Sequence, residues 1–246
     1  EAFNPAQHTL ISAASCTTTG LAHMMKPLLE NEKTRCMLTA SMSTVHAVTN
    51  SQCVLDSVPK AGAKDLRKSR SILDNIILTS TNAAEALALA IPEVKEIGFM
   101  ADSIRIPTKT ESLIILNVTF QSRIGKDGEI SHIDTATIND IYKQAETKGP
   151  ERLLVYSEEQ NVSADVVGID ASIVIEGQFN HTRTAFIDVD LAHIPGLSRE
   201  VLDSFPLKTL KIPVVHAKIF GWYDNEYGSY TNRMGDLAVY VHKMMK

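Results

Sequence analysis

The order of strand-forming and helix-forming segments constrains the fold of this chain more than any other feature of its sequence. Residues that favour strands dominate seven segments, at 9–12, 35–48, 103–107, 112–121, 166–176, 184–189 and 214–222. Helical spacing of apolar residues is found at 21–29, 82–90, 138–145 and 235–246. Strands that do not alternate strictly with helices are typical of α+β folds. The sequence therefore predicts an α+β fold.

Prolines, a glycine and a capping pattern set the expected ends of the helices. Pro27 is expected to kink or shorten the first helix, and Pro92 to end the second. Asn82 followed by Glu85 resembles a capping box at the start of the second helix. Gly149-Pro150 is expected to stop the third.

Composition and charge exclude several classes of protein. The formal net charge is −5 with a pI of about 5.9, and the basic residues are mostly scattered, so we expect no nucleic-acid partner. No apolar run reaches the roughly 18–20 residues that span a bilayer, and no secretory leader opens the sequence. The three cysteines form no CxxC pair, which disfavours a disulfide scaffold and a zinc site. We expect a cytoplasmic protein without membrane contact or metal.

A cysteine and a histidine are the candidate nucleophile and base. Cys16 lies where a predicted strand gives way to a helix, and a helix N-terminus lowers the pKa of a thiol. His46 ends a predicted strand, and a distant Cys/His pair can meet in the fold. The alternative for a lone cysteine is a buried structural residue, which is our interpretation of Cys36 and Cys53. The pair alone is a weak signal because the chain has 8 histidines.

A series of motifs in a fixed order strengthens the prediction that Cys16 and His46 are the nucleophile and the base. Ala14-Ser15-Cys16-Thr17-Thr18, Thr44-Val45-His46-Ala47 and Trp222-Tyr223-Asp224-Asn225-Glu226 resemble, in order and approximate spacing, the glyceraldehyde-3-phosphate dehydrogenase family. Shorter similarities lie between them, and the resemblance covers nearly the whole chain. These are Asp65-Leu66-Arg67, Thr79-Ser80-Thr81-Asn82-Ala83-Ala84, Ile104-Arg105-Ile106-Pro107, Tyr156-Ser157-Glu158-Glu159 and Ser163-Ala164-Asp165.

The resemblance implies a domain plan. The sheet would be mixed, largely antiparallel and covered by helices, with remnants of a Rossmann domain at both ends. Residues 1–15 would be the tail of a nucleotide-binding domain, 16–227 the catalytic domain, and 228–246 a C-terminal helix that packs on the nucleotide-binding domain. No G-x-G-x-x-G fingerprint is found, so we expect most of the NAD- or NADP-binding part to lie outside this sequence.

The resemblance also implies the chemistry. Cys16 would attack the aldehyde of glyceraldehyde 3-phosphate, forming a thiohemiacetal and then a thioester that inorganic phosphate converts to 1,3-bisphosphoglycerate. His46 would pair with the thiolate as an ion pair and move the proton. The resemblance implies that the phosphate of the substrate is bound by Thr49, Arg105 and Arg70. Inorganic phosphate would be bound by Ser15, Thr17 and Thr81, and the nicotinamide would be contacted by Asn225. The full-length protein would be a homotetramer in glycolysis or gluconeogenesis, and this chain alone would be inactive.

Several positions depart from the family pattern. Asn82 replaces a glycine whose backbone approaches phosphate, and Ser51 replaces an acidic residue. Residues 49–69 form a long loop with extra residues near 59–62, and a loop of this length is usually functional or lies at an interface.

Other readings remain open. Within the class, erythrose 4-phosphate or another aldehyde phosphate is an alternative substrate. Semialdehyde dehydrogenases are disfavoured by the segment at 222–226. Outside the class, the chain could be a non-catalytic oligomerisation fragment or a Cys/His hydrolase that uses no nucleotide.

Overall fold

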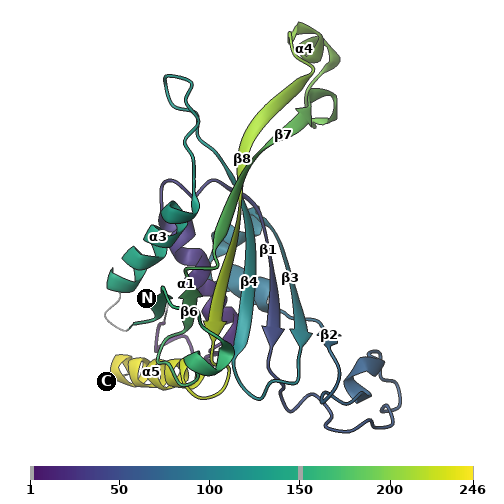
Figure 1. Cartoon of the computed structure of the whole chain (residues 1–246), viewed down its shortest axis with the longest axis vertical. Coiled ribbons are helices and arrows are strands. Elements are labelled where there is room, and N and C mark those ends of the chain that lie inside the picture. Colours follow the sequence, from purple (N-terminus) through teal and green to yellow (C-terminus); the bar gives the residue numbers. More distant parts are fainter. Residues whose placement is uncertain (1–2, 149–151, 246) are drawn as a thin grey trace.

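A single mixed sheet forms the centre of the molecule (Figure 1). The computed structural model describes residues 3–148 and 152–245, and within these ranges eight strands share the sheet. Their order is β2-β3-β1-β4-β8-β6-β5, and β7 pairs with β8 beyond this path. Only β1 with β3 and β5 with β6 are parallel among the described pairs. The predicted α+β class with a largely antiparallel sheet is confirmed.

Helix α1 precedes the first strand, α5 follows the last, and the other helices lie between strands along the chain. Their bounds are β1 (Met37–His46), β2 (Ile77–Thr79), β3 (Gly98–Arg105), β4 (Ser112–Gln121), β5 (Leu154–Ser157), β6 (Ile173–Glu176), β7 (His181–Asp190) and β8 (Thr209–Tyr223). The α-helices are α1 (Cys16–Glu30), α2 (Ala83–Ala90), α3 (Thr135–Lys148), α4 (Arg199–Ser204) and α5 (Ser229–Met244). Short 3₁₀ helices span η1 (Leu66–Ser69), η2 (Pro92–Glu96), η3 (Ser163–Val166) and η4 (Leu191–His193).

Helix α1 is the element around which the core is organised. It packs on β4, β6 and β8 and also contacts α2, α3 and α5. Alternate residues of β4 point toward it, as the period of a strand requires, and they are fully buried. The apolar face of α1 meets them at helical spacing. The shared core includes Ile114, Leu116, Val118 and Phe120 from β4 and Leu21, Met24, Met25 and Leu28 from α1.

A glycine allows α1 to approach the sheet closely. A Cβ atom at Gly221 of β8 would lie 2.8 Å from Ile173 Cδ1 and 2.9 Å from Met24 Sδ. Distances this short are not tolerated between non-bonded atoms, so a larger residue would push α1 off the sheet. Because α1 begins at Cys16, this contact helps to set the position of the thiol.

The β7–β8 hairpin extends well beyond the rest of the sheet, with α4 at its tip (Figure 1). β8 alone has 15 residues, and its first part, residues 209–213, pairs only with β7 among the described strands. Large apolar side chains on this arm are exposed. They are Phe186, Ile187, Val201, Phe205, Leu207 and Leu210.

Several local predictions were wrong in ways that tertiary contacts explain. Residues 9–12 are not a strand, and in the described part of the chain they pair with no neighbour. Of the strand predicted at 166–176, only Ile173–Glu176 forms one. Helix α1 begins at Cys16 rather than at residue 21 and continues through Pro27 to Glu30. β5 was not predicted from periodicity.

The capping box at α2 is also not formed. The side chain of Asn82 makes no capping hydrogen bond, and the Thr81 hydroxyl instead accepts one from the Ala83 N–H at 3.2 Å. Pro92 does follow the end of α2, as predicted, and opens η2. The predicted stop at Gly149-Pro150 lies outside the described residues.

Candidate active site

The first turn of α1 presents Cys16 at the positive end of a helix. Ser15 is the N-cap residue, and its Oγ accepts a hydrogen bond from the Thr18 N–H at 3.1 Å. Ala14, just before it, has a φ of 57°, so the chain turns sharply into the helix. The first N–H groups of a helix have no partner within it and favour negative charge nearby. The helix end taken alone therefore favours a negative charge on the thiol.

The sheet brings a histidine to this thiol. His46 is the last residue of β1 and is paired in register with Arg105, the last residue of the parallel strand β3. The carboxyl ends of both strands therefore meet at one edge, facing the start of α1. The His46 Nε2 lies 3.6 Å from the Cys16 Sγ. This places the predicted nucleophile and base in direct contact.

The other nitrogen of His46 has two neighbours that require different tautomers. Nδ1 lies 2.7 Å from the carbonyl oxygen of Ala47 and 2.5 Å from Nη1 of Arg105. Ala47 favours a proton on Nδ1, which leaves Nε2 free to accept one from Cys16. A guanidinium can only donate, so Arg105 favours the tautomer with the proton on Nε2. Arg105 thus competes with the tautomer in which His46 can act as a base.

The electrostatics of the pair favour its neutral form. Burial raises the pKa of the Cys16 thiol, although hydrogen bonds from Thr17 and the charge of Arg105 partly offset this. Burial, reinforced by the charge of Arg105, lowers the pKa of His46 to about 4. The ion pair expected from the sequence is therefore not favoured in this arrangement, because a guanidinium already adjoins the imidazole.

A pocket of about 500 Å³ opens beside the sulfur. The N-termini of both α1 and α2 contribute to its wall. Among the residues proposed for anions or cofactor, the pocket is lined by Ser15, Thr17, Thr49, Thr81, Arg105 and Asn225. These six residues, which the sequence analysis named one by one, therefore lie together around one pocket.

The individual side chains are held differently. The Thr49 Oγ1 lies within 3.0 Å of Gln52 Oε1 and 2.9 Å of Ser51 Oγ, on the rim of the pocket. Arg105 is half-buried, and its Nε has no hydrogen-bond partner among the described residues. An unpaired buried guanidinium nitrogen is costly, so an anion at this position would satisfy it.

Arg70 is not part of this site. It is exposed, its Nε lies 3.3 Å from both carboxylate oxygens of Asp56, and it does not line the pocket. The prediction that Arg70 binds the substrate phosphate is therefore not supported by its position. The loop at 49–69 turns it toward its local acidic partner.

Two residues to which the sequence analysis assigned no role shape the site. Tyr223, the last residue of β8, is buried, and its hydroxyl lies 2.8 Å from Thr17 Oγ1. Asp224 follows it and accepts hydrogen bonds from four backbone N–H groups, those of Gly168, Glu226, Tyr227 and Gly228. Burial opposes ionisation of Asp224, but these donors outweigh it and hold its pKa below the usual range.

The ordered turn at Asp224 fixes the next residue. Asn225 reaches the pocket, and its Oδ1 accepts a hydrogen bond from Ser112 Oγ at 3.1 Å. The alternation along β8, which turns Tyr223 inward with the other buried residues of the strand, was the signal that could have identified Tyr223.

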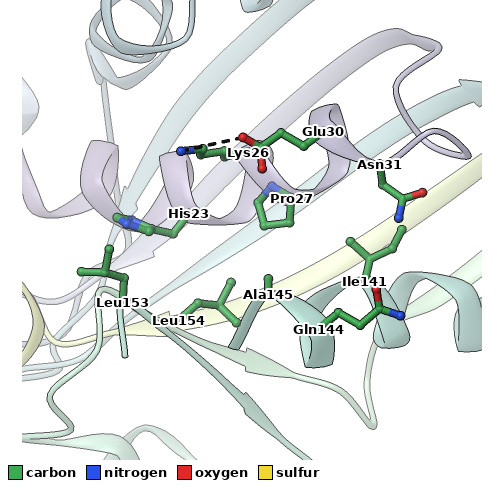
Figure 2. Close-up of a pocket in the computed structure, with 10 residues that line it drawn as sticks. All are labelled: His23, Lys26, Pro27, Glu30, Asn31, Ile141, Gln144, Ala145, Leu153 and Leu154. Atoms are coloured by element: carbon green, nitrogen blue, oxygen red, sulfur yellow. Dashed lines mark ion pairs between the residues drawn. The ribbon is translucent and has the colours of Figure 1, made fainter. Parts of the chain in front are cut away.

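A second pocket, of about 270 Å³, lies between α1, α3 and the start of β5 (Figure 2). His23 is in its wall, but the His23 Nδ1 is hydrogen-bonded to the Thr19 carbonyl at 2.8 Å, and burial lowers its pKa. Lys26 and Glu30 form an exposed ion pair at 3.8 Å on its edge. None of its lining residues is a cysteine or an arginine, so it lacks the chemistry of the first pocket.

The part of the chain that the structure describes offers neither a metal site nor a membrane-spanning helix. No group of three or more His, Cys, Asp or Glu side chains there is arranged to hold a metal ion. In the same residues, no helix combines the length and apolar character needed to cross a membrane.

Most of this chain is similar to known proteins. A family model described as glyceraldehyde 3-phosphate dehydrogenase, C-terminal domain, matches residues 15–195. Glyceraldehyde-3-phosphate dehydrogenase 2 of Streptomyces avermitilis is 34% identical over 97% of this chain and 57% of its own length. The glyceraldehyde-3-phosphate dehydrogenase of Streptomyces coelicolor is 35% identical over 97% of this chain and 57% of its own length. Glyceraldehyde-3-phosphate dehydrogenase 1 of Bacillus cereus is 34% identical over 98% of this chain and 58% of its own length. The chain thus spans little more than half the length of these relatives.

Proposed function

Since the chain belongs to the glyceraldehyde-3-phosphate dehydrogenase family, through that family's C-terminal domain, we propose that it supplies the catalytic half of a phosphorylating aldehyde dehydrogenase. The substrates would be glyceraldehyde 3-phosphate and inorganic phosphate, and the product 1,3-bisphosphoglycerate. The observation that carries this proposal is the 3.6 Å contact between Cys16 Sγ and His46 Nε2 at a pocket lined by two helix N-termini and Arg105. Helix N-termini and arginine are the groups that bind phosphate in proteins.

The first half of the reaction uses the sulfur and the imidazole. The Cys16 sulfur attacks the aldehyde carbon, its proton passes to Nε2 of His46, and the carbonyl oxygen takes a proton to become the hydroxyl of a thiohemiacetal. NAD or NADP, when bound, supplies the acceptor for the hydride that leaves this carbon. His46 removes the hydroxyl proton as the thioester forms.

The second half uses the anion-binding groups. An oxygen of inorganic phosphate attacks the thioester carbon, the carbon–sulfur bond breaks, and the sulfur regains a proton. Ser15, Thr17 and Thr81, at the starts of α1 and α2, would hold this phosphate, and Arg105 with Thr49 the phosphate of the substrate. Asn82, whose side chain makes no cap hydrogen bond, lines the same wall.

Substrate binding would also prepare the base. When Arg105 turns toward a phosphate, Nδ1 of His46 is left to donate to the Ala47 carbonyl, and Nε2 becomes the acceptor for the Cys16 proton. The anion would offset the charge of Arg105 and raise the pKa of His46. Deprotonation of the thiol would thereby be coupled to the arrival of the phosphorylated substrate.

The residues present fit a nicotinamide at the mouth of the pocket. The Ser112 hydroxyl donates to the Asn225 Oδ1 and not to the amide nitrogen of Asn225. This nitrogen can therefore donate to the carboxamide oxygen of a nicotinamide. Asn225 is half-buried, as expected for a group that contacts a cofactor edge. We propose that the rest of the cofactor is bound by residues outside this sequence, and that this chain alone does not turn over.

The domain plan and assembly are part of the same proposal. Residues 16–227 would form the catalytic domain, with 1–15 and 228–246 bordering the nucleotide-binding domain. Exposed apolar side chains on α5 suit such a contact; they are Met234, Val239, Tyr240 and Met244. The exposed apolar residues of the β7–β8 arm suit contacts within a cytoplasmic homotetramer. Light scattering of the full-length protein would test the tetramer.

A half-reaction that needs no nicotinamide tests the chemistry on this chain directly. Because the phosphate step is reversible, an acyl phosphate should acylate Cys16. We expect intact-mass and peptide spectrometry to find one acetyl group on Cys16 after incubation with acetyl phosphate, and added inorganic phosphate to remove it. Cys36→Ser should be acylated like the wild type, and Cys16→Ser should not. Equal acylation of Cys36 and Cys16 would contradict the proposal.

The identity of the aldehyde is tested with the full-length protein. We expect phosphate-dependent reduction of NAD or NADP with glyceraldehyde 3-phosphate to exceed that with erythrose 4-phosphate in kcat/KM. The reverse order would make the four-carbon sugar phosphate the substrate. Turnover without any nicotinamide would point instead to a hydrolase.

A further inference from the structure

Tyr223 connects the two elements that carry the proposed nucleophile and base. Its side chain is 1% exposed, and its hydroxyl lies 2.8 Å from Thr17 Oγ1 and 2.7 Å from Thr44 Oγ1. Thr17 follows Cys16 in the first turn of α1, and Thr44 lies two residues before His46 on β1. The phenol therefore bridges the start of α1 and the end of β1 from a third element, β8.

The hydrogen atoms of this cluster can be assigned by counting donors. A phenol has one hydrogen, so it can donate to only one of the two threonines and must accept from the other. Thr17 adjoins Cys16 in the chain, and its hydroxyl lowers the pKa of the Cys16 thiol, as a hydrogen-bond donor to the sulfur would. If the Thr17 hydroxyl donates to the sulfur, it accepts from Tyr223, and Tyr223 accepts from Thr44. The donors then run in one direction, Thr44 to Tyr223 to Thr17 to Cys16.

The ring of Tyr223 also meets the base. It packs edge-on against the imidazole of His46, with ring centroids 5.9 Å apart and an angle of 78° between the planes. Edge-to-face packing of this kind fixes ring orientation. The imidazole that faces Cys16 is therefore held by Tyr223 on one side and by the Ala47 carbonyl on the other.

We propose that Tyr223 is a positioning residue for Cys16, which orients the Thr17 hydroxyl as a hydrogen-bond donor to the sulfur and thereby favours the thiolate. This inference rests on the proposed function, because it assumes that the Cys16 thiolate is the nucleophile. It goes beyond that function in assigning a role to a phenol that does not line the pocket. Aligned hydrogen bonds in a low-dielectric interior strengthen one another, so that Tyr223 can affect Cys16 through Thr17.

Removal of one oxygen atom tests the proposal. Tyr223→Phe keeps the ring and its packing on His46 but breaks the donor row. The measurement is the rate of Cys16 alkylation by iodoacetamide between pH 6 and pH 10, followed by peptide mass spectrometry on the 246-residue chain. We expect the apparent pKa of the thiol to rise, and the rate near neutral pH to fall roughly three- to tenfold, as for loss of one ordinary hydrogen bond.

A matched control separates this effect from simple loss of a buried hydroxyl. Tyr142 is fully buried, and its hydroxyl donates to the Met24 carbonyl at 2.8 Å, on α1 but away from the thiol. Tyr142→Phe should lower stability without changing the pH profile of Cys16 alkylation. An unchanged profile in Tyr223→Phe, or the same shift in both variants, would overturn the proposal.

A second variant protects the test against misfolding. Thr44→Val removes the first donor of the row and retains the shape of the side chain on β1. It should raise the apparent pKa of Cys16 in the same direction as Tyr223→Phe but by less. If circular dichroism shows that Tyr223→Phe does not fold, the test rests on Thr44→Val. An unchanged apparent pKa of Cys16 in Thr44→Val would then overturn the proposal.

The pH profile is interpretable because the groups facing the sulfur are known. They are His46 from β1, Arg105 from β3, Tyr223 from β8 and Tyr230 from α5. Failure of the proposed function is separate. If the wild-type chain is not acylated by acetyl phosphate, the function fails, whereas normal acylation with an unchanged Tyr223→Phe profile refutes only the role of Tyr223.

Discussion

A buried carboxyl group next to the site provides the sharpest test of the structure as a whole. Glu111 precedes β4, is 2% exposed, and neither of its carboxyl oxygens has a hydrogen-bond partner among the described residues. Burial, with a smaller contribution from the charge of Asp224, raises its pKa from 4.5 to about 8. The group is therefore protonated in the folded chain at neutral pH and ionised in the unfolded chain.

The sign of the effect on stability follows from proton linkage. The folded state binds the proton more tightly, so the stability that Glu111 contributes is fully present below about pH 4.5 and is lost as the pH rises to about 8. Each pKa unit corresponds to about 1.4 kcal/mol, which gives roughly 3 kcal/mol by pH 7. Relaxation of the folded chain and penetration of water around the ionised carboxylate should reduce this to about 1–2 kcal/mol. Glu111→Gln, an uncharged mimic of the protonated acid, should therefore be the more stable protein above pH 4.5.

Urea denaturation at a series of pH values measures this difference. We expect the two proteins to have similar free energies of unfolding at pH 4.5 and to diverge steadily up to pH 8, with Glu111→Gln ahead. The φ of 71° at this position is shared by both proteins, so backbone strain cancels. For Glu129→Gln, a change at an exposed position, the plot of unfolding free energy against pH should remain parallel to that of the wild type. Parallel curves for Glu111→Gln as well would show that the carboxyl is solvated and that this reasoning is wrong.

Three further predictions concern the site and its support. Because the pKa of His46 is lowered from 6.5 to about 4, the contribution of His46 to stability should fall as the pH drops through this interval, opposite in sign to that of Glu111, so the free energy of unfolding of His46→Asn should rise relative to that of the wild type in the same urea series; a difference that does not change with pH would contradict this. Arg105→Met should raise the pKa of His46, because a neighbouring positive charge is removed, and an NMR titration of the imidazole that shows no rise would contradict the contact. Gly221→Ala should destabilise the chain by about 1–3 kcal/mol through overpacking against Ile173 and Met24, and an unchanged urea midpoint would refute the close approach of α1.

The parts of the fold that periodicity predicted well are those in which each strand has one buried face. The predicted bounds of β4, 112–121, agree with the structure because its apolar residues alternate without interruption. β3 was predicted too short, since Gly98 and Asp102 are poor strand formers, and its parallel pairing with β1 overrides their preference. Helix α1 continues through Pro27 because the residues around it are held in the core.

The polar groups of the site could be predicted where they lie in recognisable sequence motifs. The motifs around Cys16, His46 and Arg105 led to residues that the sheet brings together. The position of Arg70 outside the pocket could not be predicted, because its partner Asp56 is 14 residues away in an irregular loop and such a contact leaves no periodic pattern in the sequence. The role of Tyr223 depends on Thr17 and Thr44, which lie 206 and 179 residues away, so only the folded chain reveals it.

The length of β8 gives the molecule a mechanical axis. The strand runs unbroken from Thr209 near the tip of the arm to Tyr223, and ten of its residues are in register with β4. A force applied to α4 and directed along β8 would act on all the hydrogen bonds between β8 and β4 at the same time, in shear. A tether on β5, at the edge of the sheet, would instead break its bonds one after another. Optical tweezers applied through the arm should therefore meet the higher rupture force.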